Sequence, residues 1–461
     1  MEESVIQIVL ALFYLLSLVL IATLIRHGVP GVRDVFVPVS LISGTLGLLI
    51  GPQVLGRIWA AWRDAEQASG LVSDDVLAVW SLLPGLFINV VFAALFLGKP
   101  IPGLRKMWLQ AGPQIMLGHT MAWGQYVIGI ALVLFWLAPV WGVHPAAGAL
   151  LEISFVGGHG TVAGMRSAFE ELDFAAATDL GLGLATVGII AGAVIGTVLV
   201  NWAVRRKIVG LEKNDDVETG SAGDKPVPPS QWPRRLSVHW ALIGVAIAIG
   251  WGLRHLLIWT ENHTWGERIE LFQYMPLFPL AMVGALLLQI ILSRLGLADL
   301  VDRELVNRIS ALALDILVTA ALATLSLAVI GAYWWPFVIL GSAAIIWNVV
   351  AFLLLAPRMV PRDWFARGAG DFGQSIGMAA LGLLLIQLAD PHNRSQAKER
   401  FGYKQVLFEP LVGGGLFTAA SVPLIAQVGA GPVLIGTTVI TLVFLFGGFG
   451  LCRYEQRNKR N

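Results

Sequence analysis

Two glycine-rich stretches bring polar side chains into otherwise apolar sequence. The first is Gly-Gly-His-Gly-Thr at 157–161, and the second runs from Asp371 to Met378. Glycine lets the backbone approach a ligand closely. Where a helix begins inside a bilayer, its free N–H groups and its dipole favour an anion such as a carboxylate. Free carbonyls and hydroxyls at such a break can instead bind Na⁺. These stretches therefore predict a site for a small anion and a cation.

Each stretch has its own polar groups. In the first, Thr161 offers a hydroxyl, and His159 is either a hydrogen-bond donor or proton carrier, or a structural residue satisfied by backbone. In the second, Asp371, Gln374 and Ser375 are the polar groups. Asp371 could instead cap a helix at the cytoplasmic interface. The glycines that accompany these side chains are Gly157, Gly158, Gly160, Gly373 and Gly377.

Other polar residues lie inside predicted spans, where a charge is costly and usually faces protein or water. Asp315 is the clearest intramembrane acid and is a candidate cation or proton site. Asn89 lies in the equivalent helix of the first half, so the two could pair across the site. Asp179 and Glu409 start the spans that follow the two stretches, where helix capping is the ordinary explanation. The oxygen-bearing candidates for a Na⁺ site are Thr161, Asp315 and Ser375.

The elements that must position these residues are transmembrane helices. The 461 residues are 56% hydrophobic and 13% charged, with a mean hydropathy of +0.75, which excludes an ordinary soluble domain. We expect an all-α polytopic membrane protein. Runs of about 20 apolar residues, each long enough to cross a bilayer, predict about eleven spans: 4–26, 35–52, 77–98, 112–137, 178–203, 237–259, 272–295, 306–329, 332–356, 404–427 and 430–452.

The two glycine-rich stretches belong to segments that are too interrupted for ordinary spans. Segments 145–166 and 368–389 favour re-entrant hairpins, although two glycine-rich helices remain the alternative. Glu152 lies in the first hairpin and could line the pathway. The four-residue repeat of Gly188, Gly192 and Gly196 predicts close helix packing without chemistry.

Charges between the spans predict the orientation, because cytoplasmic loops collect Lys and Arg. An outside N-terminus puts the acidic loop with Glu261, Glu267 and Glu270 outside as well. The basic loops and the basic C-terminal tail then fall in the cytoplasm; their residues are Arg26, Arg33, Lys99, Arg105, Lys106, Arg205, Arg206, Lys207, Arg358, Arg362, Arg367, Arg453, Arg457, Lys459 and Arg460. Eleven spans and two hairpins satisfy this distribution.

The chain divides into two membrane halves. Residues 1–204 form the first repeat, 205–236 a flexible cytoplasmic linker, 237–429 the second repeat, and 430–461 an extra helix with the basic tail. The stretches 158–165 and 371–378 align without gaps and both end in Gly-x-x-x-Gly-Met. Five spans separate equivalent points, so the second half is inverted. Broken segments at matching places in inverted halves are typical of a transporter's site near the middle of the membrane.

The motifs of the first half resemble the bacterial sodium:glutamate symporter family. Besides residues 157–161, the resemblance rests on Ala177-Thr178-Asp179 and Ala185-Thr186-Val187-Gly188, and it covers about residues 1–430. It implies a dimeric elevator-type carrier of the bacterial inner membrane that couples Na⁺ entry to uptake of glutamate or a related anionic amino acid. It also implies that residues 157–161 help to form the site. Asp179 and Thr186 join the candidates because they lie in these motifs.

The second half departs from the family pattern. The family has Gly-Ala-Thr-Pro-Thr where this sequence has Ser375-Ile376-Gly377-Met378-Ala379, so two hydroxyls are absent. The alternatives are therefore a Na⁺-coupled carrier of another organic anion, or a cation/proton antiporter, which Asp315 and segment 37–52 favour. The extra helix also departs from the family and moves the C-terminus to the cytoplasm.

Other functional classes find little support. Residues 373–377 match Gly-x-Ser-x-Gly in letters, but no strand precedes them, so no enzyme is expected. A single cysteine, Cys452, excludes an intramolecular disulfide and a cysteine-based metal cluster. No basic stripe predicts nucleic-acid binding. The expected partners are the lipid bilayer, the small anionic substrate and Na⁺ as the coupling ion, with no other cofactor.

Overall fold

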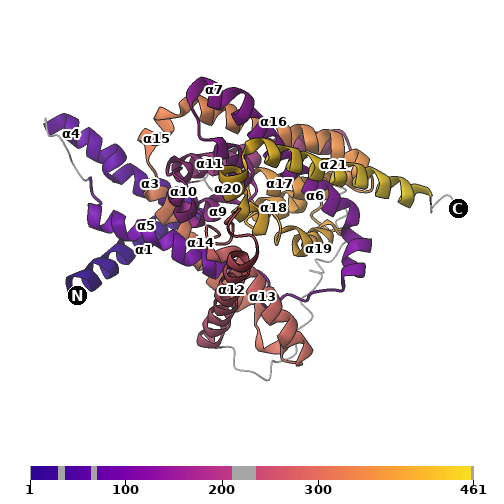
Figure 1. The fold of residues 1–461 in the computed structure, drawn as a ribbon, viewed down its shortest axis with the longest axis horizontal. Coiled ribbons are helices and arrows are strands. Elements are labelled where there is room, and N and C mark those ends of the chain that lie inside the picture. The colour runs from indigo at the N-terminus through magenta and orange to yellow at the C-terminus, as the bar shows by residue number, and fades with distance from the viewer. Residues whose placement is uncertain (1, 30–36, 64–69, 210–234, 458–461) are drawn as a thin grey trace.

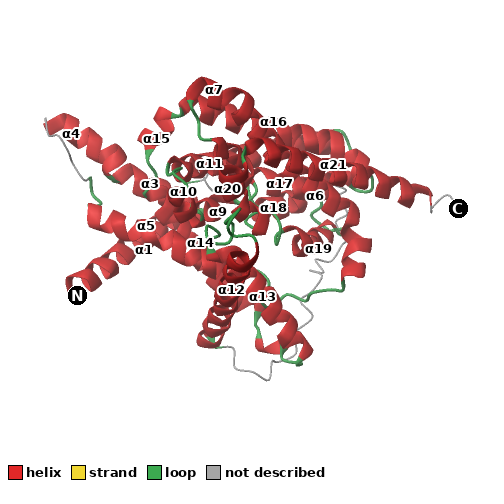
Figure 2. Cartoon of the chain, viewed as in Figure 1, coloured by secondary structure: helices red, strands yellow, loops and turns green. Residues whose placement is uncertain are grey.

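The computed structural model describes residues 2–29, 37–63, 70–209 and 235–457. Within these ranges the chain is helical throughout and has no strand, so the expected all-α class is confirmed (Figures 1 and 2). Most of the expected linker at 205–236 lies outside the described residues, as do Arg33, Lys459 and Arg460.

Ten helical segments of the described chain are long and apolar enough to cross a membrane. A polytopic membrane protein is therefore confirmed. The long helices are α1 (Glu2–Gly28), α3 (Val39–Ile50, continued by α4, Arg57–Arg63), α5 (Asp74–Ala93), α6 (Leu104–Leu132), α11 (Ala176–Arg205), α12 (Leu236–Thr264), α13 (Leu277–Arg294), α14 (Arg303–Ala323), α16 (Trp334–Met359) and α21 (Ala430–Arg457).

The expected span at 404–427 is not one helix, which corrects the count of eleven. It is divided into α19 (Ala397–Phe408) and α20 (Leu416–Val428). The intervening loop contains Gly413 and Gly414, whose φ angles are +74° and +98°. Residues that carry a side chain rarely adopt this left-handed backbone region, so glycine is needed for the break. Hydropathy alone does not detect it, because glycine does not reduce the apolar character of the segment.

The two expected hairpins are pairs of short helices. The first contains η3 (Pro145–Ala149), α8 (Leu150–Phe155) and α9 (Gly158–Gly164), followed by α10 (Arg166–Glu171). The second contains α17 (Trp364–Ile376) and α18 (Ala379–Ala389), which pack against each other. Both segments are interrupted at the glycine-rich stretches.

The helices form two bundles that share part of one apolar core. We call α1, α3, α5, α12, α13 and α14 the peripheral bundle, whose buried residues form two clusters on either side of the crossing of α5 and α14. The central bundle contains α6, α11, α16, α21 and all the interrupted helices. Its apolar core is the largest and extends into the peripheral bundle through residues such as Leu41, Phe92, Phe278 and Leu317. In Figure 1, α1 and α5 lie at one side of the central bundle, and α12 and α13 lie together at its lower edge.

The glycine repeat of α11 fits the second hairpin. A Cβ on Gly188 would collide with the carbonyl oxygen of Ile376. On Gly192 it would lie 2.6 Å from Cγ2 of Ile376, and on Gly196 it would lie 2.7 Å from the side chain of Leu385. Close helix packing by this repeat is thus confirmed, and it brings α11 against both helices of the hairpin.

Candidate functional site

Three helix breaks meet inside the central bundle. A Cβ placed on Gly158, at the start of α9, would lie 3.6 Å from the carbonyl oxygen of Gly377, between α17 and α18. One on Gly414, in the loop before α20, would lie 2.7 Å from Oγ1 of Thr161. Gly413 approaches Val156 in the same way, at 3.3 Å. The breaks near residues 157, 377 and 414 are therefore neighbours, although they are far apart in the sequence.

A buried carboxylate connects the first hairpin to the loop before α20. The Glu152 Oε1 atom accepts hydrogen bonds from the backbone N–H of Gly413 at 2.6 Å and from the Thr418 hydroxyl at 3.2 Å. The Tyr126 hydroxyl, from α6, lies 2.5 Å from the other oxygen, Oε2. Glu152 and Tyr126 have no solvent exposure. Glu152 thus supplies the anion for this break, so the break is closed by the protein itself.

The polar side chains of the first break bind to nearby backbone and to α11. Nε2 of His159 lies 2.9 Å from Oγ1 of Thr186, which donates in turn to the carbonyl of Leu182. The Thr161 hydroxyl donates to the carbonyl of Gly157 at 2.9 Å. The structure therefore brings together His159 and Thr186, two of the residues predicted from sequence, while Thr161 faces Gly157 and the loop before α20.

The second break is anchored by an amide from α6. Nε2 of Gln125 donates to the carbonyl of Ser375 at 2.7 Å and to Oδ1 of Asn348, from α16, at 3.2 Å. The Ser375 hydroxyl is buried and has no hydrogen-bond partner among the described residues. The carbonyls of residues 375 to 377 and this hydroxyl are the oxygens that the second break can offer.

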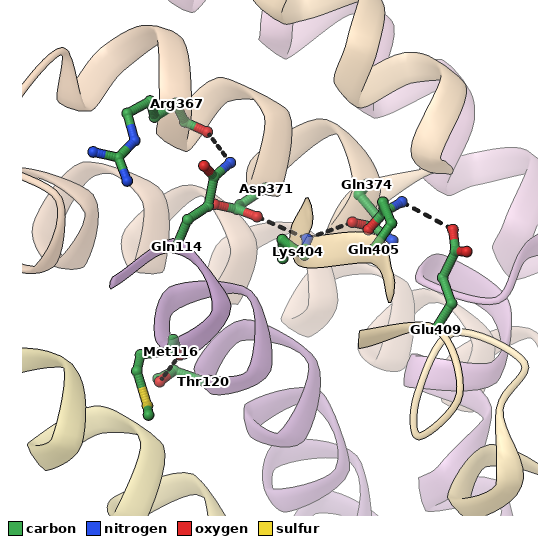
Figure 3. A network of polar contacts seen from close by, with 9 residues as sticks. All are labelled: Gln114, Met116, Thr120, Arg367, Asp371, Gln374, Lys404, Gln405 and Glu409. Atoms are coloured by element: carbon green, nitrogen blue, oxygen red, sulfur yellow. Dashed lines mark hydrogen bonds and ion pairs between the residues drawn. The ribbon is translucent and has the colours of Figure 1, made fainter. Parts of the chain in front are cut away.

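The polar face of α17 contacts a lysine of α19. Lys404 Nζ donates to Oδ1 of Asp371 at 2.7 Å and to Oε1 of Gln374 (Figure 3). Gln114, from α6, lies beside Asp371 and donates to the carbonyl of Arg367. Asp371 lies inside α17 and is fully buried, so its interpretation as a helix cap is wrong.

Glu409 follows the last turn of α19 and does not start a span, so its interpretation as an N-terminal cap is also wrong. Its Oε1 atom accepts from Nε2 of Gln405, as Figure 3 shows. The charges of Lys99 and Arg303, in the peripheral bundle, also act on this carboxylate. Arg303 additionally donates to the carbonyls of Ala94 and Leu97.

The remaining acidic candidates contact other elements. Asp179 Oδ1 accepts from the backbone N–H of Ser326 at 2.8 Å, at the start of α15 (Leu327–Ala332), so it caps a different helix from its own. Asp315 hydrogen-bonds to Ser40 of α3, within the peripheral bundle. Asn89 donates to the carbonyl of Gly85 in its own helix. None of these contacts joins the three breaks.

Sequence reasoning did not single out Lys404 or Tyr126. Lys404 lay at the edge of a predicted span, where a lysine is usually placed at the membrane surface. One sequence signal was present: Phe401 and Phe408 lie three residues before and four residues after Lys404, on one face of a helix. No sequence signal indicated Tyr126, because a tyrosine in an apolar helix is common.

Known proteins are similar to this chain over most of its length. The model of a family described as Sodium/glutamate symporter matches residues 83–382. The curated Sodium/glutamate symporter of Escherichia coli is 25% identical over 395 residues, covering 81% of this chain and 92% of the relative. That of Haemophilus influenzae is 23% identical over 397 residues, with the same coverage. The family match includes the first hairpin and α17, ends within α18 and does not reach α19.

Proposed function

The chain belongs to the sodium/glutamate symporter family, and from this premise we propose that it carries glutamate or a closely related anionic amino acid into the cell together with Na⁺. The observation that supports this proposal best is the meeting of three helix breaks inside the central bundle. Broken helices near the middle of a membrane protein supply unsatisfied backbone groups to both anions and cations. The related proteins are named as symporters, not enzymes.

The substrate carboxylate is assigned to the start of α18. This helix begins at Ala379 directly after the second break, and no side chain caps its first N–H groups. The first turn of a helix leaves such groups free and carries a partial positive charge. The first N–H groups of α20 are already satisfied, because those of Leu416 and Phe417 donate to the carbonyls of Pro410 and Leu411. The start of α18 is therefore the better place for an anion that must arrive and leave.

The coupling Na⁺ is assigned to the first break. Thr161 contributes a hydroxyl there, and the carbonyls around Gly157 contribute further oxygens. Thr186 hydrogen-bonds to His159 beside the same break and orients the His159 side chain. Asp315, another candidate for Na⁺, contacts Ser40 within the peripheral bundle, whereas Ser375 lies at the neighbouring second break.

We further propose that the central bundle moves against the peripheral bundle, as in an elevator, and that the two halves are inverted repeats. Two clusters of buried apolar residues that lie wholly within the peripheral bundle support the first proposal. The contacts of the peripheral bundle support the second, because α3 packs on α1 and α14, while α13 packs on α12 and α5. These contacts are interchanged when α1, α3 and α5 are exchanged for α12, α13 and α14, as a two-fold axis requires.

The proposed setting is the bacterial inner membrane, with the N-terminus outside and the C-terminus in the cytoplasm. The distribution of Lys and Arg between spans supports this orientation. The membership of the family supports a homodimer, since its members are usually dimeric. Light scattering of the purified protein, corrected for detergent, measures the oligomeric state.

The deciding experiment is uptake into proteoliposomes. Labelled glutamate is supplied with an inward Na⁺ gradient or with choline in its place, and a pH-sensitive dye reports proton movement in parallel. We expect accumulation only with the Na⁺ gradient. A panel of unlabelled organic anions, used as competitors, identifies the substrate class. Cation-driven proton efflux without Na⁺-dependent uptake would establish the antiporter alternative and exclude the symporter.

A further inference from the structure

A lysine ammonium lies fully buried in the central bundle. Lys404 has no solvent exposure, and neither does Asp371, its partner at 2.7 Å. Burying an isolated ammonium costs several kcal/mol, so such a group persists only when its surroundings compensate it. Lys404 belongs to α19 and Asp371 to the second hairpin. Along the chain, these elements are connected by the loop that follows α18.

The surroundings of this ammonium form a cradle of oxygen atoms. Oδ1 of Asp371 and Oε1 of Gln374 accept its hydrogen bonds. Oδ2 of Asp371 and Oε1 of Gln114 are also buried and have no hydrogen-bond partner in the described chain. Three carboxylate and amide oxygens therefore belong to the two side chains that hold the ammonium, and Gln114 lies beside Asp371. Such hard oxygens are the ligands that Na⁺ prefers.

The rest of the cradle fits a cation of this size. A Cβ on Gly118 of α6 would lie 2.8 Å from Cε and 2.9 Å from Nζ of Lys404, so glycine leaves the space that the ammonium occupies. The rings of Phe401 and Phe408 have their centroids 5.0 Å and 4.2 Å from Nζ, within the range of a cation–π interaction.

We propose that the Lys404 ammonium is a tethered substitute for a monovalent cation in an oxygen-lined site of the second hairpin. The positive charge that neutralises Asp371 is covalently attached and cannot exchange with solution. Removal of the lysine side chain opens the same oxygens to Na⁺. The family match ends before α19, so this lysine lies outside the region on which the family assignment rests.

One consequence rests on the proposed function. If the second hairpin carries its own cation, it takes no Na⁺ during transport, and coupling depends on the first break alone. This agrees with the absence from the second break of two hydroxyls that the family pattern contains there.

The test is a measurement of thermal unfolding in detergent, which needs no transport activity. Na⁺ replaces choline at constant ionic strength, and the shift in Tm is recorded for the intact chain and for Lys404→Ala. We expect the Na⁺-dependent shift of Lys404→Ala to exceed that of the intact chain by about 2–4 °C, as a ligand that binds only the folded state requires. The additional shift should vanish in Asp371→Asn/Lys404→Ala.

Lys398→Ala is the matched control, because it removes a positive charge from the same helix outside the cradle; it should respond to Na⁺ as the intact chain does. Lys404→Gln, which keeps a donor for Asp371, is the second variant. Equal Na⁺ shifts in Lys404→Ala, Lys404→Gln and the intact chain would overturn the proposal. So would failure of both variants to fold in Na⁺ buffer, because Na⁺ should then replace the ammonium. A negative uptake experiment alters neither readout and counts only against the proposed function.

Discussion

Glu152 shows how one side chain can determine which helix break is open. Its carboxylate binds the loop before α20 and the hydroxyls of Tyr126 and Thr418, so it occupies the position that an external anion would need there. The start of α18 has no such internal group. We therefore regard the break before α20, which contacts buried Glu152, as structural, and the break before α18 as the one that binds substrate.

Removal of the Glu152 carboxylate should destabilise the protein more than removal of one of its partners. Glu152→Ala leaves the Tyr126 hydroxyl and the Gly413 N–H buried without an acceptor, at a cost of about 2–4 kcal/mol. Tyr126→Phe removes one hydrogen bond and should cost about 1–2 kcal/mol. Thermal unfolding in detergent measures both changes. Equal Tm values for Glu152→Ala and the intact chain would mean that the carboxylate does not hold the loop.

The hydroxyl of Thr161 is expected to act on Na⁺ dependence without affecting the fold. It donates to the carbonyl of Gly157 at the start of its own helix, so Thr161→Ala removes little stability. We expect the Na⁺ concentration for half-maximal glutamate uptake to rise by about tenfold, which corresponds to about 1.4 kcal/mol of lost cation binding. The measurement is initial uptake at varied Na⁺.

Thr197→Ala is the matched control for this change. Thr197 makes the same hydrogen bond, to the carbonyl four residues earlier in α11, but it is an exposed residue. It should transport normally. If the two variants have the same Na⁺ dependence, Thr161 is not part of the cation site.

At the scale of elements, the contact of α11 with the second hairpin depends on the absence of side chains. Gly188 lies directly against the carbonyl of Ile376, one residue before the second break. A methyl group at this position must displace backbone, because no flexible side chain can move aside. The position of the break is therefore coupled to α11, which also holds His159 of the first break through Thr186.

Gly188→Ala should lower both stability and transport. Overpacking of this kind costs about 1–3 kcal/mol, and displacement of the break should reduce the affinity for substrate. Gly436→Ala in α21 is the control, since a Cβ there meets nothing within 4 Å; in open space this change is neutral or slightly stabilising. Thermal unfolding and glutamate uptake are measured for both. A Gly188→Ala protein with unchanged Tm and KM would contradict the coupling.

The elements could be predicted from sequence to different extents. Long spans such as α16 follow from hydropathy, because about 20 apolar residues in a row have few other structures. The two hairpins could be predicted because their glycines lie among polar residues. The break between α19 and α20 could not, because Gly413, Gly414 and Gly415 lie in apolar surroundings and Glu152, which binds the loop, is distant in the sequence. Lys404 was missed for the same reason: its partner Asp371 belongs to another element.

At the scale of the whole molecule, the two bundles meet through buried apolar residues and through an exposed polar contact. The backbone N–H of Glu270, in the loop between α12 and α13, donates to Oε1 of Gln427 at the end of α20. Nε2 of Gln427 donates back to the carbonyl of Glu270. These two hydrogen bonds are exposed, whereas Met275, Leu280, Ala419 and Ala420 form a buried apolar cluster between the same elements. The exposed polar contact is a suitable place to test whether the central bundle moves.

A covalent link at this contact should arrest transport if the bundles slide past each other. Glu270→Cys and Gln427→Cys, combined in a Cys452→Ser background, place two thiols where backbone and side chain already touch. Oxidation should join them and abolish glutamate uptake, because the site in the central bundle can then no longer change its depth relative to the peripheral bundle. A reductant should restore uptake, and each single-cysteine variant should be indifferent to both treatments. Full uptake by the oxidised, cross-linked protein would exclude the elevator motion, because Gln427 is continuous through α20 with the break at Gly414, and a fixed α20 requires a fixed site.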